Sequence, residues 1–139
     1  MITLEELQRR GTGFLPGYLG VAITGLAEQE IRAELSVQPH HIAPKGYLHA
    51  GAIVTLADTA SGYGCIAHLP AGATGFTTIE LKSNFLGTAR DGIIACVAKA
   101  VHLGRTTQLW DAVVTHRETG RTIALFRCTQ LVLYPKEPS

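Results

Sequence analysis

Apolar and polar residues alternate with two different periods along this chain, and these periods predict its helices and strands. The capping-box pattern of Thr3 and Glu6, followed by leucines at helical spacing, predicts a short helix over Thr3–Arg10. Over Gln29–Val37, charged and apolar residues alternate with the period of a half-buried strand. The expected strands are Tyr18–Leu26, Gln29–Val37, Phe76–Leu86, Gly92–Leu103, Thr107–Arg117 and Arg121–Tyr134. Short connectors join the last four, which favours antiparallel pairing there.

A single long helix is predicted between the second and third strands. It covers Ala50–His68, follows the loop Pro39–Gly46, and is closed by the proline- and glycine-containing segment Leu69–Gly75. Long antiparallel strands around a helix that is apolar on most sides predict an α+β fold, with a curved sheet wrapped around the helix. Such a sheet leaves edge strands, which natural proteins cover or pair, so we expect a dimer that continues the sheet.

Composition places the chain among globular proteins and excludes several functions. Its 139 residues, 46% hydrophobic and 17% charged, fit a single domain over residues 1–139. No segment reaches the roughly 18 apolar residues of a membrane span, and the N-terminal MITLEELQRR lacks the apolar region of a signal peptide. A net charge of +1 gives no electrostatic case for nucleic acid. The cysteines show no CxxC spacing and indicate buried thiols in a reducing cytoplasm: Cys65, Cys96 and Cys128.

Asp58 is the only formally charged residue of the predicted central helix. Aspartate disfavours helix interiors and is rarely buried without a partner, so its presence needs a reason. Thr55 and Gly62 share its face and form a narrow polar stripe with it. Gly62 and Gly64 each weaken a helix by roughly 1 kcal/mol relative to alanine, which indicates that something approaches closely there. We interpret Asp58 as a catalytic carboxylate; the alternative is a structural acid bonded to a neighbouring hydroxyl or backbone amide.

The start of the same helix offers a second reactive feature. First-turn amides lack intrahelical acceptors and carry partial positive charge, so those of Ala50 and Gly51 can bind a developing oxyanion. Ala50 and Asp58 are eight positions apart, roughly 12 Å along a helix. Reacting groups must come within about 3–3.5 Å, so one carbon cannot meet both within one chain. If both act, the helix start of one subunit faces Asp58 of another.

These residues resemble the signature of a known family. His49–Gly51 followed by Leu56–Asp58 is similar to the HGG…LAD pattern of hotdog-fold acyl-CoA thioesterases of the phenylacetic-acid-degradation (PaaI-like) type. The resemblance extends over Gly46–His49, Thr77–Phe85 and Gly104–Thr106, and so covers nearly the whole chain.

The resemblance implies a hotdog dimer, or a tetramer of two dimers, that hydrolyses an aryl- or fatty-acyl-CoA without metal or organic cofactor. Asp58 matches the catalytic carboxylate, as nucleophile or as general base for water. The Ala50 amide matches the group that polarises the thioester carbonyl, and His49 shapes the helix start. Thr78 matches a hydroxyl near the water or nucleophile. Contacts with CoA are implied for Phe85, His102, Leu103, Gly104, Arg105 and Thr106, with Arg105 as the phosphate partner.

Two positions depart from the family pattern. The usual first glycine of HGG is Ala50, which is tolerated only if the local φ suits a residue with a Cβ. Some relatives carry an asparagine six residues before the histidine, where this chain has Ala43. If that asparagine orients the water, this chain must do so otherwise.

Plainer interpretations stand beside the catalytic ones. His49 can be a satisfied histidine at a helix start, Thr78 a strand residue, Arg105 a solvated charge and Gly104 a turn residue. The histidines before the helix have no metal-ligand spacing.

Two rival functions share the fold. Hydration or dehydration of an enoyl thioester commonly needs a histidine base, and His49 is the histidine at the start of the helix. A non-catalytic hotdog protein would bind acyl-CoA without turnover. A third alternative is a folded domain with no thioester ligand, in which Asp58 is structural.

Overall fold

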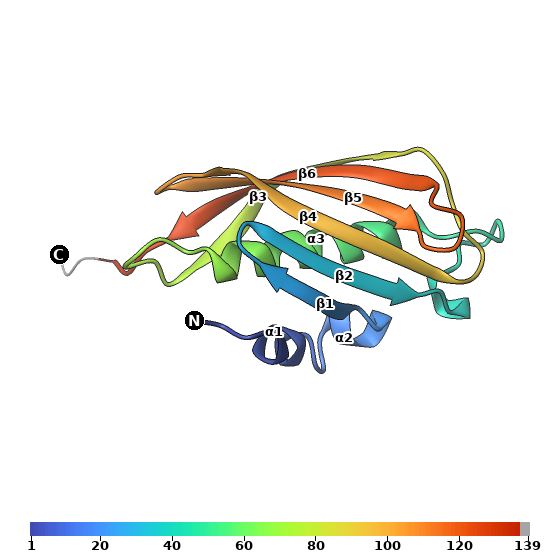
Figure 1. The fold of residues 1–139 in the computed structure, drawn as a ribbon, viewed down its shortest axis with the longest axis horizontal. Helices are drawn as coiled ribbons and strands as arrows, with labels where there is room; N and C mark the ends of the chain where they lie inside the picture. The colour runs from blue at the N-terminus through green and yellow to red at the C-terminus, as the bar shows by residue number, and fades with distance from the viewer. Residues whose placement is uncertain (137–139) are drawn as a thin grey trace.

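One antiparallel sheet curves around one long helix in the computed structural model, which describes residues 1–136 (Figure 1). The helices are α1 (Leu4–Arg10), α2 (Leu15–Leu19) and α3 (Ala50–Ala67), with a 3-10 turn η1 at Pro39–His41. The strands are β1 (Ala22–Ala27), β2 (Glu30–Ser36), β3 (Gly75–Phe85), β4 (Ile93–Leu103), β5 (Thr107–His116) and β6 (Thr122–Leu133).

The strand order β1-β2-β4-β5-β6-β3 places α3 at the centre of the fold. The chain leaves β2, passes through α3 along the inner face of the sheet, and re-enters the sheet at its far edge as β3. Neighbouring strands pair antiparallel throughout. Inward side chains such as Ile94, Trp110 and Phe126 are buried with the apolar side chains of α3. The predicted sheet wrapped around a central helix is therefore confirmed.

Two glycines allow α3 to lie close to the sheet. A Cβ added at Gly64 would lie 2.6 Å from the ring of Trp110, and one added at Gly62 would lie 3.0 Å from the ring of Phe76. The loss of helix propensity at these positions thus makes room for two aromatic rings. The close approach predicted from the two glycines is confirmed.

Gly64→Ala is expected to lower the free energy of unfolding by about 1–3 kcal/mol, the usual cost of overpacking a close-packed core. The fully buried Trp110 has no room to withdraw, so the clash outweighs the gain in helix propensity of roughly 1 kcal/mol. Urea denaturation measures the difference. Gly75→Ala is the matched control, because an added Cβ there meets nothing within 4 Å. A Gly64→Ala variant as stable as the wild type would contradict this packing account.

The two edges of the sheet differ in their protection. Beside β1, the side-chain amide of Gln8 on α1 donates to the Val21 carbonyl at 3.1 Å and accepts from the Ile23 amide at 2.7 Å. It therefore occupies backbone groups that would otherwise be unpaired. The β3 edge carries exposed apolar side chains, among them Ile79 at 57% exposure and Leu81 at 43%. The unprotected edge of the sheet is β3.

The N-terminal region differs from the prediction at one helix. The strand expected over Tyr18–Leu26 begins only at Ala22, because Leu15–Leu19 forms α2. Pro16 lies in the first turn of α2, and Gly20 ends it in the left-handed conformation with φ 86°. This arrangement of proline at the start and glycine just past the end is typical of a helix, and the chain cannot be extended there. The assignment of Tyr18 to a strand was wrong.

The remaining elements agree with the predicted ones to within one or two residues at each end. Thr3 caps α1, and both hydrogen bonds of the capping box with Glu6 are present. The three cysteines are buried and free, as expected for thiols. The predicted polar tail Tyr134–Ser139 is described as far as residue 136, and its remainder lies outside the described residues.

Candidate active site

The start of α3 leaves one backbone amide available. His49 is the N-cap, and its Nδ1 accepts a hydrogen bond from the Gly51 amide at 2.8 Å. The His49 carbonyl accepts from the amides of Ala52 and Ile53. Within residues 1–136, no acceptor is recorded for the Ala50 N–H, and Ala50 is exposed. Of the two predicted oxyanion donors, the Gly51 amide is occupied by His49 and the Ala50 amide is free to bind a ligand.

Alanine fits the first position of the helix without strain. Among the described residues other than glycine, only Gln29 has a positive φ, so Ala50 has an ordinary backbone conformation. Gly51 is more constrained by its surroundings, because a Cβ there would lie 2.9 Å from His49 Nδ1. The change from glycine to Ala50 in the family pattern therefore keeps the amide in place.

Asp58 lies two turns further along α3 and has a buried, unpartnered oxygen. Its Oδ1 is shielded from solvent and has no hydrogen-bond partner among the residues described. Burial raises the pKa of the Asp58 carboxyl above its ordinary value. A buried acceptor without a partner costs about 1–3 kcal/mol, so Asp58 is held at a cost to stability. The alternative interpretation was a structural acid that accepts from a nearby hydroxyl or amide. No such hydrogen bond to Oδ1 is present among the residues described.

A buried polar cluster lies on the inner face of β6, which packs against α3. The negative charge of Asp58 is one cause, after burial, of the raised pKa of the Cys128 thiol, about 12. The Gln130 side chain donates to Cys128 Sγ at 3.4 Å and accepts from the Thr78 hydroxyl at 2.6 Å. Gln130 is fully buried. Sequence reasoning missed both β6 residues; the only signal was a glutamine at an inward position of a strand.

Ala50 and Asp58 remain apart within the chain. Both lie on the unbroken helix α3, so their separation of roughly 12 Å stands. A site that uses both groups on one carbon needs a second copy of the chain.

Comparison with known proteins identifies the family. The sequence profile of the Thioesterase superfamily matches residues 45–127, more than half of the chain, including the start of α3 and Asp58. The chain belongs to the thioesterase superfamily. It is 31% identical to the 1,4-dihydroxy-2-naphthoyl-CoA hydrolase of Escherichia coli strain K12, over 95% of this chain and 96% of that protein.

Solved structures of other thioesterases have the same fold. A mutant of thioesterase PA1618 from Pseudomonas aeruginosa is 28% identical with a TM-score of 0.90, over 96% of this chain and 95% of that one. The Escherichia coli PaaI protein of the phenylacetic acid degradation operon shares the hotdog fold, with 23% identity, a TM-score of 0.77, and coverage of 85% of this chain and 83% of that one. The predicted hotdog thioesterase family and the assignment as a thioester hydrolase are confirmed.

The residues that the resemblance assigns to CoA lie at two ends of this thioesterase's sheet. Phe85 pairs with Ala124 at the start of β6, whereas Thr107, next to the β4–β5 turn, pairs with Leu131 near its end. Ala124 and Leu131 are seven positions apart along β6, which is roughly 24 Å. Phe85 therefore does not contact His102–Thr106 within one chain.

The turn between β4 and β5 explains Gly104 and presents Arg105. The Gly104 amide donates to the Thr107 carbonyl at 2.9 Å, and an added Cβ would lie 2.8 Å from that oxygen. Gly104 thus has a structural reason to be glycine. Arg105 is exposed, with its guanidinium 5.7 Å from the centre of the Tyr134 ring. The remaining predicted contacts here, His102, Leu103 and Thr106, are also exposed.

A hollow of about 360 Å³ opens beside the start of α3. It is largely apolar and is lined by Ala43, Tyr47, Leu48, His49, Ala50, Ile53, Phe85, Gly87 and Thr88. Its size falls within the range of small-molecule sites, about 300–1,000 Å³. The hollow brings Phe85 next to the free Ala50 amide.

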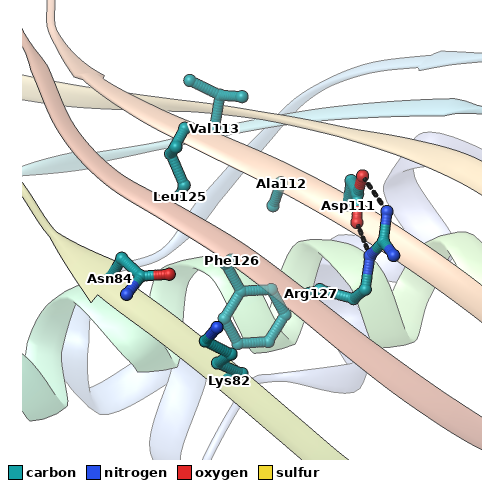
Figure 2. A pocket seen from close by; sticks show the side chains of 8 residues that line it. All are labelled: Lys82, Asn84, Asp111, Ala112, Val113, Leu125, Phe126 and Arg127. Carbon is teal, nitrogen blue, oxygen red and sulfur yellow. Dashed lines mark hydrogen bonds and ion pairs between the residues drawn. The ribbon is translucent and has the colours of Figure 1, made fainter.

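A second hollow, of about 340 Å³, lies on the outer face of the sheet over β3, β5 and β6 (Figure 2). Arg127 binds both carboxylate oxygens of Asp111 there, at 2.6 and 2.9 Å. None of the predicted site residues lines it. In the part of the chain that the structure describes, no three histidine, cysteine or acidic side chains group as metal ligands. No helix there is long and apolar enough to cross a membrane.

Proposed function

We propose that the protein hydrolyses an acyl-CoA thioester with Asp58 of one protomer and the Ala50 amide of its partner. The observation that carries the proposal is the buried Asp58 Oδ1 without a partner in a thioesterase fold. Stability is commonly given up at positions that carry chemistry. A carboxylate held without a hydrogen bond is also a stronger base than a solvated one, because burial raises its pKa.

A homodimer formed through β3 would complete this site. Gln8 protects the β1 edge, whereas the β3 edge is open and apolar. Antiparallel pairing of two β3 strands about a twofold axis reverses the ends of the partner's sheet. The partner's Arg105 end would then approach this chain's Phe85 end, which joins the two separated groups of predicted CoA contacts. Two such dimers can associate further into a tetramer.

The chemistry requires an ionised Asp58 in either of two routes. As general base, Asp58 takes a proton from water while the water oxygen bonds to the thioester carbon. As nucleophile, its oxygen forms that bond first and water cleaves the resulting anhydride. In both routes the carbon–sulfur bond breaks, the CoA thiolate takes up a proton, and the Ala50 amide stabilises the charge on the carbonyl oxygen. No metal or organic cofactor is needed.

An aryl- or fatty-acyl group is the proposed acyl part of the substrate. The Escherichia coli relative named as a 1,4-dihydroxy-2-naphthoyl-CoA hydrolase favours an aryl group. The apolar hollow beside Ala50 has the volume for either class. Three free, buried cysteines agree with a reducing compartment, and we propose a cytoplasmic enzyme without nucleic-acid or membrane partners.

The test is release of free thiol from a panel of phenylacetyl-, benzoyl-, dihydroxynaphthoyl-, hexanoyl- and palmitoyl-CoA. Catalytic release from at least one ester supports the proposal and ranks the acyl groups. Saturable binding without release would favour a non-catalytic acyl-CoA-binding protein. Conversion of an enoyl-CoA without release of CoA would favour a hydratase, although His49, the candidate base at the start of α3, already accepts from Gly51.

Arg105→Ala is expected to raise KM for CoA esters several-fold with little change in kcat, because an exposed arginine contacts phosphate rather than the reacting carbon. Steady-state kinetics with an acyl-CoA and with the matching acyl-pantetheine ester separate the two effects. The pantetheine ester lacks the nucleotide, so its KM should not change. An unchanged KM for the CoA ester would rule out Arg105 as the phosphate contact.

A further inference from the structure

Gln130 has a fixed orientation in the buried wall behind Thr78. It lies on the inner face of β6 with no exposed surface. Its carbonyl oxygen accepts the Thr78 hydroxyl at 2.6 Å, and its amide nitrogen donates to Cys128 Sγ at 3.4 Å. Both ends of the amide are thus engaged. In this orientation the carbonyl oxygen faces the Thr78 hydroxyl and the amide faces Cys128, and burial between these two partners holds the side chain in place.

The orientation of the Gln130 side chain determines which hydrogen bonds the Thr78 hydroxyl can form with a ligand. A threonine hydroxyl has one hydrogen to donate and two lone pairs that accept. Since the hydrogen is committed to Gln130, the side of Thr78 that faces away from Gln130 can only accept. A water molecule beside Thr78 would therefore donate one of its hydrogens to it.

The pairing of β3 with β6 also places Thr78 directly beside Gln130. The pairing of β3 with β6 shifts between Thr78 and Glu80, so Ile79 is an extra residue in β3. Such a bulge breaks the alternation of a strand and re-aims its side chains. Thr78 pairs directly with Gln130, and beyond the bulge Leu81 pairs with Cys128. Thr78 and Cys128 therefore lie on the inner face of neighbouring strands. The helix α3 packs against this face just beyond Asp58, since a Cβ added at Gly62, one turn further along, would lie 3.0 Å from the ring of Phe76, two residues before Thr78.

We propose that Gln130 is a positioning residue for hydrolysis, which fixes Thr78 as an acceptor that orients the attacking water toward Asp58. The inference rests on the proposed thioesterase function and takes Asp58 as the base. One hydrogen of the water passes to Asp58 and the other is bound by Thr78, while the water oxygen bonds to the thioester carbon. The carbon–sulfur bond then breaks, and Asp58 returns its proton to the leaving CoA thiolate.

The test compares kcat and KM for two variants and their double. Gln130→Met keeps the approximate volume and removes both hydrogen bonds, and Thr78→Val removes the hydroxyl at the strand edge. Each is expected to lower kcat by about tenfold or more with KM within about twofold, because misdirection of the water affects the chemical step. The double variant should be no worse than the poorer single variant, since both remove the same interaction. Thr78→Ser, which keeps the hydroxyl, should retain most of kcat.

Gln108→Met is the matched control. Gln108 is the other fully buried glutamine and pairs with Gln130 across β5 and β6, but its side chain bonds to the His68 carbonyl and to Trp110. It should lower stability as much as Gln130→Met and leave kcat unchanged. An equal loss of kcat in both glutamine variants, or multiplied losses in the Thr78–Gln130 double variant, would overturn the proposal.

Two outcomes separate this inference from the proposed function. If the wild type releases no thiol from any ester, the thioesterase proposal itself fails. If the wild type is active, Asp58→Asn is inactive, and Gln130→Met and Thr78→Val keep full kcat, only the role of Gln130 fails. Should Gln130→Met not fold, Thr78→Val decides, because it removes the same hydrogen bond from its other end. Full kcat in Thr78→Val would then overturn the proposal.

Discussion

Asp58→Asn is expected to lower kcat by at least about a hundredfold, the low end of what a general acid–base group contributes. The amide is nearly the size of the carboxyl group but can neither take a proton from water nor attack the thioester carbon. Both proposed routes therefore fail at the same step, whereas substrate binding should persist. Thiol release under single-turnover conditions, with KM from steady-state kinetics, measures the loss.

The same variant is expected to be more stable than the wild type at neutral pH. Burial raises the pKa of Asp58 in the folded chain above its value in the unfolded chain. The folded state then binds more protons between the two pKa values, so stability falls as pH rises through this range and stays lower above it. Asparagine removes this dependence. Thermal unfolding of both proteins from acid to neutral pH should show the difference in stability between them growing as Asp58 ionises.

Asp111→Asn is the matched control for Asp58→Asn. Asp111 lies on the outer face of the sheet and accepts two hydrogen bonds from Arg127 (Figure 2). The same chemical change there should leave kcat unchanged and should not raise stability, because it weakens an existing ion pair. An Asp58→Asn variant with wild-type turnover would refute the proposed mechanism and also the inference on Gln130.

Ala50→Pro is expected to lower kcat by about 10²–10³-fold, the range found when one oxyanion donor is removed. Ala50 is the first residue of α3, where proline is tolerated because the missing N–H has no intrahelical acceptor. His49 already has the extended backbone that precedes a proline, with φ −68° and ψ 136°. The substitution therefore removes one amide hydrogen and leaves the helix in place. Circular dichroism and kcat together check this.

Ala50→Ser is the control, since it alters the side chain and keeps the amide. It should retain most of the activity, and a Ser variant as impaired as the Pro variant would refute the role of the backbone N–H. Mixing Asp58→Asn with Ala50→Pro protein then tests the composite site. Random exchange of subunits in a twofold dimer gives one intact site in each mixed dimer and about a quarter of the wild-type activity. No recovery after demonstrated exchange would refute the composite site.

The N-terminal region shows where periodicity was an insufficient guide. The pattern of Thr3 and Glu6 predicted α1 because a capping box is a local device that the structure keeps. The helix α2 was missed, although Pro16 and Gly20 mark its start and end, because five residues are too few for an apolar period to show. The long strands β3–β6 were predicted within one or two residues, since their alternation is set by one buried face.

Some residues of the candidate site could be selected from the sequence, and others could not. Asp58 and the helix start were selected as candidates from the sequence, because one charge in an apolar helix and an N-cap pattern are visible in one dimension. Gln130 and Cys128 were not found, because their importance depends on β6 pairing with β3 and packing over α3. Nothing in the sequence indicated that the Gly51 amide is occupied by His49 while that of Ala50 is free.

By itself, the sequence determined the order of the strands, the central helix, and the conflict of Asp58 with its apolar surroundings. Those properties follow from local propensity and from the periods of buried faces. Only the tertiary structure decided which edge of the sheet is open, which first-turn amide lacks an acceptor, and that Phe85 lies far from Arg105. Hydrogen-bond partners and strand order depend on residues far apart in the chain, and these long-range contacts form only when the sheet closes around α3.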